Sequence, residues 1–243
     1  MQPLFSVVIP VLYEGAAVNQ QIDRLYRQFP ADCFEIIVVD GDPEKSTVKH
    51  ILCPKVKTLT APRGRGIQMN AGAQIADGDI LIFLHADTEL PRDALRHICE
   101  IMKTGQYSAG AFRLRFDSPR RIYRFIESGA SWRYRLTRIP YGDQAIFISR
   151  SYFKKIGGFA EIPIMEDLDL MRRIKQSNDQ IFISPKCVRT SARRWEREGI
   201  VYSVLRSWIL ASLFCLGVSP HRLIGYYKIF RNEKELTANH ATN

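Results

Sequence analysis

Phe5-Ser-Val-Val-Ile-Pro-Val11 is the stretch that decides the fold of this 243-residue chain, together with Glu35-Ile-Ile-Val-Val-Asp40. Both stretches are apolar runs of strand length, which is typical of buried strands. Between them, apolar residues recur at helical spacing, at Val18, Ile22, Leu25 and Phe29. A strand, a helix and a second strand form a βαβ unit, so the sequence predicts a parallel sheet.

The same alternation continues along the first 105 residues. The predicted elements there are further strands over 57–61 and 79–85, helices over 67–75 and after Pro91, and a short helix opened by Pro43. Later in the chain the predicted elements are strands over 109–116, 144–153 and 180–184, and helices over 119–138 and 164–175. We therefore expect an α/β fold with a Rossmann-like, mixed but mostly parallel sheet flanked by helices.

The last part of the chain is expected to be a helical appendage. From Val201 onward the pattern predicts an amphipathic helix with Ser203, Arg206 and Ser207 opposite its apolar side, and a second helix with Ser219 as N-cap and Pro220 as its first residue. The apolar run 208–218 is shorter than the ~20 residues of a bilayer span. Its apolar side chains nevertheless require something that shields them from water. The protein's own core, a second subunit in a homodimer, or a membrane boundary would provide this shielding. The predicted division is a domain over 1–199 and an appendage over 200–243.

Positive charge is concentrated in the second half of the chain. The net charge is +10, and residues 111–243 hold 24 of the 35 Lys and Arg but only 12 of the 25 Asp and Glu. A basic half suits phosphates, nucleic acid or an anionic membrane surface. The five cysteines show no paired metal spacing, which predicts a reducing compartment and neither a disulfide framework nor a zinc site. We expect a cytoplasmic protein, with peripheral contact to the inner face of a membrane as an open alternative.

Acidic residues follow three of the predicted strands. They are Glu14 after the first strand, Asp40 and Asp42 at the end of the second, and Asp87 after the fourth. Open parallel sheets bind their ligands at the carboxyl ends of the strands. Three acidic strand ends therefore indicate a site for hydroxyls, a base edge and a metal, although each acid alone could equally cap a helix.

The order of these motifs resembles the family 2 glycosyltransferases of the GT-A fold. The matching pieces are Pro10…Glu14, Asp40-Gly-Asp42, Arg63-Gly-Arg-Gly-Ile-Gln-Met-Asn-Ala-Gly72, His85-Ala-Asp87 and Glu166-Asp167, within residues 4–195. The resemblance implies a GT-A fold and an inverting, metal-dependent transfer of a sugar from a nucleotide diphosphate sugar to a hydroxyl acceptor. A UDP-sugar is the expected donor, Mn²⁺ or Mg²⁺ the expected metal, and no nucleic acid is expected as a partner.

The resemblance assigns the nucleotide to the first half of the chain. Acceptor-only carboxylates suit the N–H groups of a base and the hydroxyls of a ribose. A basic glycine loop before a helix offers cations and backbone N–H groups to a diphosphate, although it could also be a solvated turn. The implied nucleotide-binding residues are Pro10, Glu14, Asp40, Asp42, Arg63, Arg65, Gln68 and Asn70.

Asp87 matches the acid that holds a metal bridging the diphosphate in this family. Mg²⁺ and Mn²⁺ need only one or two carboxylates when phosphates and water complete the shell. His85 stands where the family has the first acid of the motif. Imidazole binds Mn²⁺ but is a poor ligand for Mg²⁺, so His85 is either a metal ligand or, as we prefer, a strand-end residue hydrogen-bonded to sugar or backbone.

Glu166 and Asp167 open a predicted helix and match the family's catalytic acidic pair. The resemblance makes Asp167 the base that takes the proton of the acceptor hydroxyl, with Glu166 as its nearest competitor. Two acids in a first helical turn could instead simply interact with the helix dipole.

Two further clusters could contact the donor sugar or the acceptor. Asp143 and Gln144 lie at a turn that enters a strand, and Arg193, Arg194 and Trp195 combine guanidinium groups for phosphate with a ring for stacking on a sugar. For both clusters, a purely local structural role is equally compatible with the sequence.

Two rival functions remain open. A methyltransferase or a dehydrogenase would want a glycine-rich turn after the first strand, and the turn 11–15 has a single glycine. The other rival is a non-catalytic nucleotide-binding or membrane-associated module on the same fold, against which Asp87 and Asp167 argue.

Overall fold

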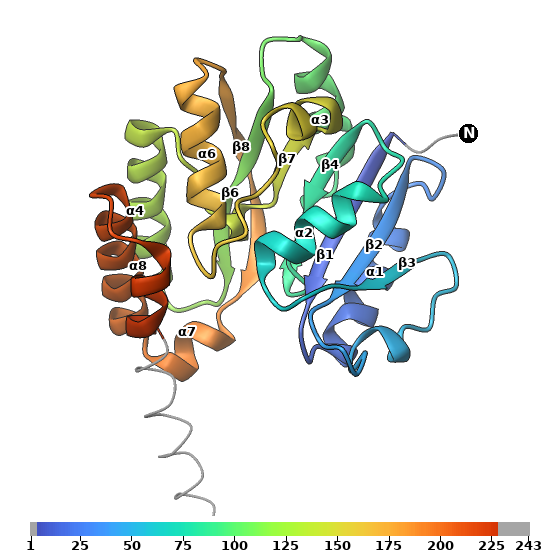
Figure 1. Ribbon diagram of the computed structural model, residues 1–243, viewed down its shortest axis with the longest axis horizontal. Coiled ribbons are helices and arrows are strands. Elements are labelled where there is room, and N and C mark those ends of the chain that lie inside the picture. Colours follow the sequence, from blue (N-terminus) through green and yellow to red (C-terminus); the bar gives the residue numbers. More distant parts are fainter. Residues whose placement is uncertain (1–3, 228–243) are drawn as a thin grey trace, which may run out of the picture.

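The computed structural model describes residues 4–227, and its centre is a curled eight-stranded sheet flanked by helices (Figure 1). The strand order is β3-β2-β1-β4-β7-β6-β8-β5. The parallel pairs are β3–β2, β2–β1, β1–β4 and β6–β8, whereas β4–β7, β7–β6 and β8–β5 are antiparallel. The expected mixed α/β sheet of the GT-A type is therefore confirmed.

The first half of the chain forms the parallel side of the sheet as the apolar runs predict. Its elements are β1 (Phe5–Val11), α1 (Gly15–Gln28), β2 (Phe34–Asp40), the 3₁₀ helix η1 (Val48–His50), β3 (Lys57–Thr60), α2 (Arg65–Gln74) and β4 (Ile80–Phe83). The short helix expected from Pro43 through Val48 is present only as the single turn η1, because residues 42–46 form a turn that the Asp42 carboxylate holds together.

The second half adds the remaining strands and most of the outer helices. Its elements are β5 (Thr88–Glu89), α3 (Ala94–Lys103), β6 (Ala109–Asp117), α4 (Arg121–Thr137), the 3₁₀ helix η2 (Gly142–Gln144), β7 (Ile146–Ser149), α5 (Arg150–Lys155), α6 (Glu166–Gln176), β8 (Ile181–Ser191), α7 (Arg193–Glu198) and α8 (Ile200–Cys215). A last helical segment covers 220–227 and begins at Pro220 as expected.

Two strands differ from the expectation. The strand predicted over 144–153 ends at Ser149, whose hydroxyl accepts a hydrogen bond from the Tyr152 N–H and caps α5. The strand predicted over 180–184 continues to Ser191, because β8 pairs along the whole of β6. Both differences arise from hydrogen bonds that apolar periodicity does not report.

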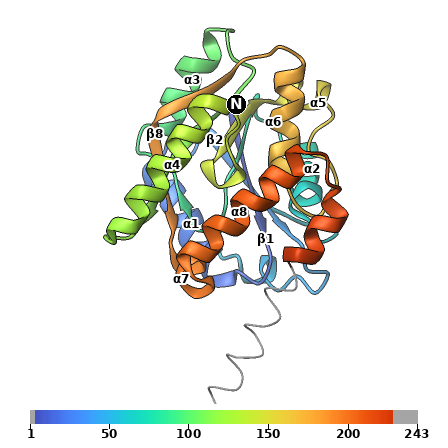
Figure 2. The same cartoon turned by 90° about the vertical axis from the view of Figure 1, so that its left-hand side faces the viewer.

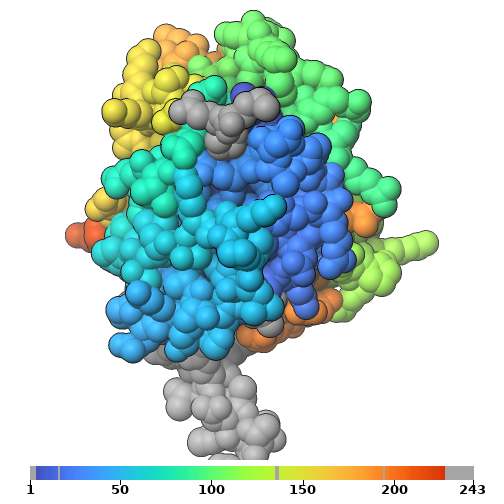
Figure 3. Space-filling view, turned by 90° about the vertical axis from the view of Figure 1, so that its right-hand side faces the viewer, coloured from blue at the N-terminus to red at the C-terminus, as the bar shows by residue number. Residues whose placement is uncertain are grey.

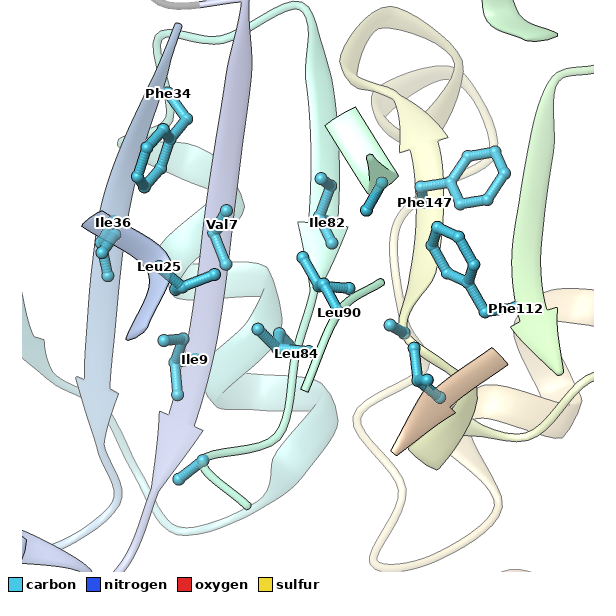
Figure 4. Close-up of a cluster of buried hydrophobic side chains, with 14 of the residues drawn as sticks. Val7, Ile9, Leu25, Phe34, Ile36, Ile82, Leu84, Leu90, Phe112 and Phe147 are labelled. Atoms are coloured by element: carbon cyan, nitrogen blue, oxygen red, sulfur yellow. The ribbon is translucent and has the colours of Figure 1, made fainter. Parts of the chain in front are cut away.

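Apolar side chains fill both faces of the sheet. One cluster packs α1 and α3 on the sheet, and Figure 4 shows Leu25 of α1 against Val7 and Ile9 of β1. The other cluster packs α2 and α6 on the opposite face. Gly72 permits this approach, since a Cβ atom there would lie 2.5 Å from the Val8 side chain.

Helix α8 packs on α6 through a third cluster, formed by Leu168, Leu210, Ala211, Phe214 and Leu223. Its orientation differs from the usual arrangement, because Ser203 is buried while Leu205, Trp208 and Ile209 are exposed. Among residues 4–227, no helix is both long and apolar enough to cross a membrane. The rest of the expected appendage, residues 228–243, lies outside the described residues.

Candidate active site

The carboxyl ends of β1, β2 and β4 meet at the lower edge of the sheet in Figure 1, where α2 also begins. Pro10 lies where β1 has already separated from β4, since the register of that pair ends at Val8. Its missing N–H therefore leaves no partner on β4 unmatched. The first turn of α2 packs closely against the loop before α6, because a Cβ atom on Gly66 would lie 2.6 Å from the Ala160 carbonyl oxygen.

Asp40 organises the loop after β2 from a fully buried position. Its Oδ1 accepts the Asp42 N–H at 3.0 Å, and its Oδ2 accepts the N–H groups of Thr47 at 2.7 Å and Val48 at 3.1 Å. The Thr47 hydroxyl in turn accepts the Glu14 N–H at 3.1 Å. Asp40 thus shapes the loops around the site, and its contact with a nucleotide stays a prediction.

The two amides expected behind the nucleotide are both occupied by the backbone. Gln68 is buried, and its Nε2 donates to the carbonyl oxygens of Val11 at 2.9 Å and Val39 at 2.8 Å, which joins the ends of β1 and β2. Asn70 donates to the Phe159 carbonyl and accepts the Phe159 N–H, each at 2.9 Å. These side chains fix the position of α2 relative to the sheet and to the loop before α6.

Glu14, Asp87 and Arg65 share one electrostatic environment. Burial raises the pKa of Glu14, the negative charge of Asp87 raises it further, and Arg65 opposes both effects. Asp87 is exposed at the end of β4 and its backbone carbonyl accepts the Ser191 N–H at 3.2 Å. Two carboxylates and a guanidinium that come from β1, β4 and α2 are therefore brought together, although they are widely separated in the sequence.

Glu166 and Asp167 form the first turn of α6 and differ in their surroundings. Glu166 is 6% exposed, and this burial, together with the charge of Asp167 and against that of Arg65, raises its pKa to about 7. Asp167 is half-buried, and its two carboxylate oxygens accept the N–H groups of Gly142 at 2.5 Å and Leu168 at 2.8 Å. The orientation of Asp167 is thus fixed by backbone from two segments.

Arg65 connects the two acidic groups. Desolvation by the surrounding protein disfavours its charge, yet the carboxylates of Glu166, Asp167 and Asp143 and the hydroxyl of Tyr227 hold its pKa above the usual range. Part of the side chain remains exposed to solvent. A cation that is held among acids and open to solvent is suited to bind an anionic group of a ligand. Arg63 is exposed in the loop before α2.

The turn before β7 places Asp143 near this group, as its effect on Arg65 shows. Gln144 is buried and structural: its Nε2 donates to the Phe112 carbonyl at 2.7 Å and its Oε1 accepts the Tyr141 N–H at 2.9 Å. A contact between Gln144 and a sugar stays a prediction.

The end of β8 lies beside Asp87, the candidate metal ligand, because the next residue, Thr88 of β5, pairs with Thr190 of β8. Arg193 begins α7 and is exposed, and Arg194 follows it in the same helix. Trp195 is half-buried with its ring 5.2 Å from that of Phe116. Stacking of Trp195 on a sugar therefore stays a prediction.

Sequence reasoning missed the contribution of the C-terminal segment to this region. The Arg206 guanidinium pairs with Glu198 and lies 4.6 Å from the centre of the Tyr227 ring, and Tyr227 influences Arg65. No local signal could have shown this, because more than 150 residues separate Arg65 from Tyr227 in the sequence.

The donor set fits a divalent metal of the kind expected. Within residues 4–227 no group of three or more His, Cys, Asp or Glu side chains is arranged to hold a metal ion. Asp87 and Glu14 nevertheless repel each other across the strand ends, which a cation would relieve. One or two carboxylates suffice for Mg²⁺ or Mn²⁺ when a diphosphate supplies the other oxygens. The His85 carbonyl accepts the Thr88 N–H at 3.1 Å, which closes the turn that presents Asp87.

A mixed sheet with carboxylates and an arginine near its strand ends is the arrangement expected of a GT-A protein. Residues 6–159, more than half of the chain, match the family model described as Glycosyl transferase family 2. The chain belongs to glycosyl transferase family 2, and the resemblance inferred from its motifs is confirmed.

Two relatives show how far the similarity extends. The chain is 24% identical to "Probable glycosyltransferase YdaM" of Bacillus subtilis (strain 168) over 230 residues, which cover 83% of this chain and 52% of the relative. It is 35% identical to "PGL/p-HBAD biosynthesis glycosyltransferase" of Mycobacterium bovis (strain BCG / Pasteur 1173P2) over 95 residues, which cover 36% of this chain and 37% of the relative. The matched parts thus span about half or less of these relatives.

Proposed function

We propose that this chain transfers a sugar from a nucleotide diphosphate sugar to an acceptor hydroxyl with inversion at the anomeric carbon. The observation that carries the proposal is the electrostatic coupling of Arg65 to two acidic groups: to Glu14, which Asp87 also influences, and to the carboxyl pair of Glu166 and Asp167. Glu14 and Asp87 suit the side of the departing diphosphate, and Glu166 and Asp167 suit the side of the attacking hydroxyl. A single base with one in-line displacement implies inversion.

Asp167 is proposed as the base. Its carboxylate is oriented by Gly142 and Leu168 and remains partly accessible, whereas Glu166 is buried. The pKa of Glu166, raised to about 7, reduces the negative charge of the adjacent pair near neutral pH, and Asp167 is proposed to accept the proton of the hydroxyl. Glu166 is the alternative base if it reaches the acceptor.

Arg65 and Arg63 are proposed to bind the diphosphate, and Asp87 with Glu14 to hold a divalent metal. When bound, such a metal stabilises negative charge on the leaving diphosphate. The guanidinium of Arg65 adds a fixed positive charge at the same edge and so favours departure of the nucleotide. A UDP-sugar is the proposed donor and Mn²⁺ or Mg²⁺ the proposed metal, with Mn²⁺ favoured only if the His85 imidazole is a ligand.

The acceptor is proposed to be a hydroxyl compound carried by a lipid. The base lies at the start of α6, which α8 covers directly through the cluster of Leu168, Leu210 and Phe214. The opposite side of α8 is apolar and exposed. The acceptor side of the site is therefore built next to a surface that suits lipid.

Calorimetry with a panel of nucleoside diphosphates and nucleotide sugars, with and without Mn²⁺, tests the donor side. We expect one nucleotide to bind with metal dependence, and a ligand at ~100 times its dissociation constant to add about 2.7 kcal/mol to the free energy of unfolding. Release of nucleoside diphosphate from the sugar nucleotide then tests turnover. Binding without any release over a panel of hydroxyl acceptors would favour the non-catalytic module and contradict the proposal.

A further inference from the structure

Helix α8 is turned so that its polar side faces the protein. Ser203 is buried and donates to Glu198 at 3.3 Å, and Arg206 pairs with the same carboxylate. The Arg206 guanidinium also lies over the rings of Tyr202 and Tyr227. An ion pair and two rings thus hold the polar side of α8 against the molecule, which fixes the direction of its other side.

The side of α8 that faces solvent is apolar almost throughout. Its exposed large side chains are Val201, Leu205, Trp208 and Ile209, and exposed Leu216 follows as the C-cap residue; their exposed fractions lie between 53% and 81%. Ser212 is the one polar residue among the exposed positions of α8. A helix on the surface of a water-soluble domain normally shows the reverse arrangement, with charged residues outside.

The neighbouring helix α4 extends this apolar surface. Phe125 is 74% exposed and Trp132 is 69% exposed, and the two helices lie close at Gly129, where a Cβ atom would be in van der Waals contact with the Trp208 ring at 3.7 Å. Figure 2 shows α4 and α8 side by side on one face of the molecule. We call the following exposed apolar residues the α4–α8 face: Ile122, Phe125 and Trp132 of α4, Val201, Leu205, Trp208 and Ile209 of α8, and Leu216 directly after α8.

The elements that border the α4–α8 face are basic. Exposed basic residues are Arg121 at the start of α4, Arg138 at its end, Arg193 and Arg197 in α7, and Arg222 in the last helical segment, against exposed Glu196. A symmetric contact with a second copy would bring two basic borders of the same charge together, which disfavours association. Anionic lipid headgroups instead complement this border, and the two tryptophans are residue types that concentrate at membrane interfaces.

We infer that the α4–α8 face docks peripherally on an anionic membrane surface. The side chains of Trp208, Leu205 and Phe125 enter the boundary between headgroups and acyl chains, and the bordering arginines contact the headgroups. Because the inner side of α8 packs on Leu168 of α6, docking places the carboxyl pair about one helix diameter, ~10 Å, from the lipid. This last consequence rests on the proposed transfer to a lipid-borne hydroxyl, whereas the docking itself does not.

Flotation of the full-length protein with vesicles tests the docking. Vesicles of phosphatidylcholine with one third phosphatidylglycerol should carry the protein at low salt, and neutral phosphatidylcholine vesicles or high salt should release most of it. The double variant Leu205→Asp/Ile209→Asp should reduce the bound fraction at least tenfold. Leu52→Asp is the matched control, because Leu52 is also exposed and lies between β2 and β3 at the other edge of the sheet.

Tryptophan fluorescence gives an independent measurement. Trp132 and Trp208, two of the three tryptophans, belong to the α4–α8 face, while Trp195 packs on Phe116. Brominated phosphatidylglycerol should therefore quench most of the emission of the wild-type protein. Trp208→Ser should remove a large part of this quenching.

Several outcomes would overturn the inference. A wild-type protein that stays at the bottom of the gradient at low salt, or a double variant that floats like the wild type, contradicts docking through this face. A dimer in light scattering that the double variant converts to a monomer, without flotation, identifies a second copy as the cover instead. Asp167→Asn should float normally even if it has lost turnover, so failure of the proposed reaction and failure of docking are distinguishable.

Discussion

Helices α1 and α8 differ in how their apolar residues are covered. In α1 the apolar residues Val18, Ile22 and Leu25 are buried against the sheet, whereas α8 is apolar on two sides, with Leu210 and Phe214 buried and Leu205 and Ile209 exposed. Apolar periodicity thus shows that a helix has an apolar side and does not show what covers that side. Departures from the usual rule are where function is expected, and α8 directly adjoins the carboxyl pair of α6.

A second contrast separates buried polar residues by their partners. Asp40, Gln68 and Asn70 hydrogen-bond to backbone and hold loops in place, whereas Glu166 is buried with a raised pKa. We therefore expect changes at the first three residues to lower stability, and changes at the carboxyl pair of α6 or at the α4–α8 face to lower activity or membrane binding.

The largest expected effect is on turnover. Asp167→Asn should lower the rate of transfer by ~10²–10⁴, the usual effect of removing a positioned base, while sugar-nucleotide binding is retained. Glu166→Gln should be milder, and Glu161→Gln, which changes an exposed carboxylate nearby, should have no effect. The rate of nucleoside diphosphate release is measured for each variant. If Glu166→Gln lowered this rate more than Asp167→Asn, Glu166 would be assigned as the base.

A pair of leucine variants tests the difference in burial between Leu25 of α1 and Leu205 of α8. Leu25→Ala leaves a cavity in the core of Figure 4 and should lower the free energy of unfolding by about 2–5 kcal/mol. Leu205→Ala should change it by less than ~0.5 kcal/mol, because this side chain is exposed. Urea unfolding measures both. Similar losses in the two variants would mean that the outer side of α8 is covered within the protein in solution.

The buried acid should make stability depend on pH. The pKa of Glu166 is raised from 4.5 to about 7 in the folded state, so the folded protein binds more protons than the unfolded chain between these values. Its contribution is therefore lost as pH rises through this window. Relative to the wild type, Glu166→Gln should gain about 2–3 kcal/mol between pH 5 and pH 8. A constant difference in urea unfolding across this range would show that Glu166 is not held as an acid.

The smallest expected effects are changes in the free energy of unfolding, which should differ between Asp40 and Asp87. Asp40→Asn should lower the free energy of unfolding by about 1–3 kcal/mol, because it disturbs the acceptors of three backbone N–H groups. Asp87 is exposed, so the free energy of unfolding of the Asp87→Asn variant should equal that of the wild type within ~0.5 kcal/mol. The variant should nevertheless lose Mn²⁺-dependent nucleotide binding. Unchanged affinity for UDP with Mn²⁺ in a folded Asp87→Asn variant would remove this residue from the metal site.

The opposite side of the molecule provides the reference for these comparisons. Figure 3 shows that side, where segments from the first third of the chain cover the surface. Its edge strand β3 is short, only Lys57–Thr60, and Lys57 pairs there with Glu35 at 2.7 Å and with Asp77 at 2.6 Å. A charged, short edge is the usual protection of a sheet against further pairing, in contrast to the apolar α4–α8 face.

The sequence by itself determined the parallel half of the sheet and the sheet edge at which the acids of the candidate site gather. The bounds of β1 agree with its apolar run, and the acids after β1, β2 and β4 lie at one edge, because strand period and the carboxyl-end rule are local or topological properties. Only the tertiary structure decided what each polar group does. Gln68 bonds to residues 29 and 57 positions away, and α8 turns its polar side inward because Glu198, Tyr202 and Tyr227 meet Arg206 there. Such choices depend on which partners packing brings together, and a periodic pattern along the chain contains no record of those partners.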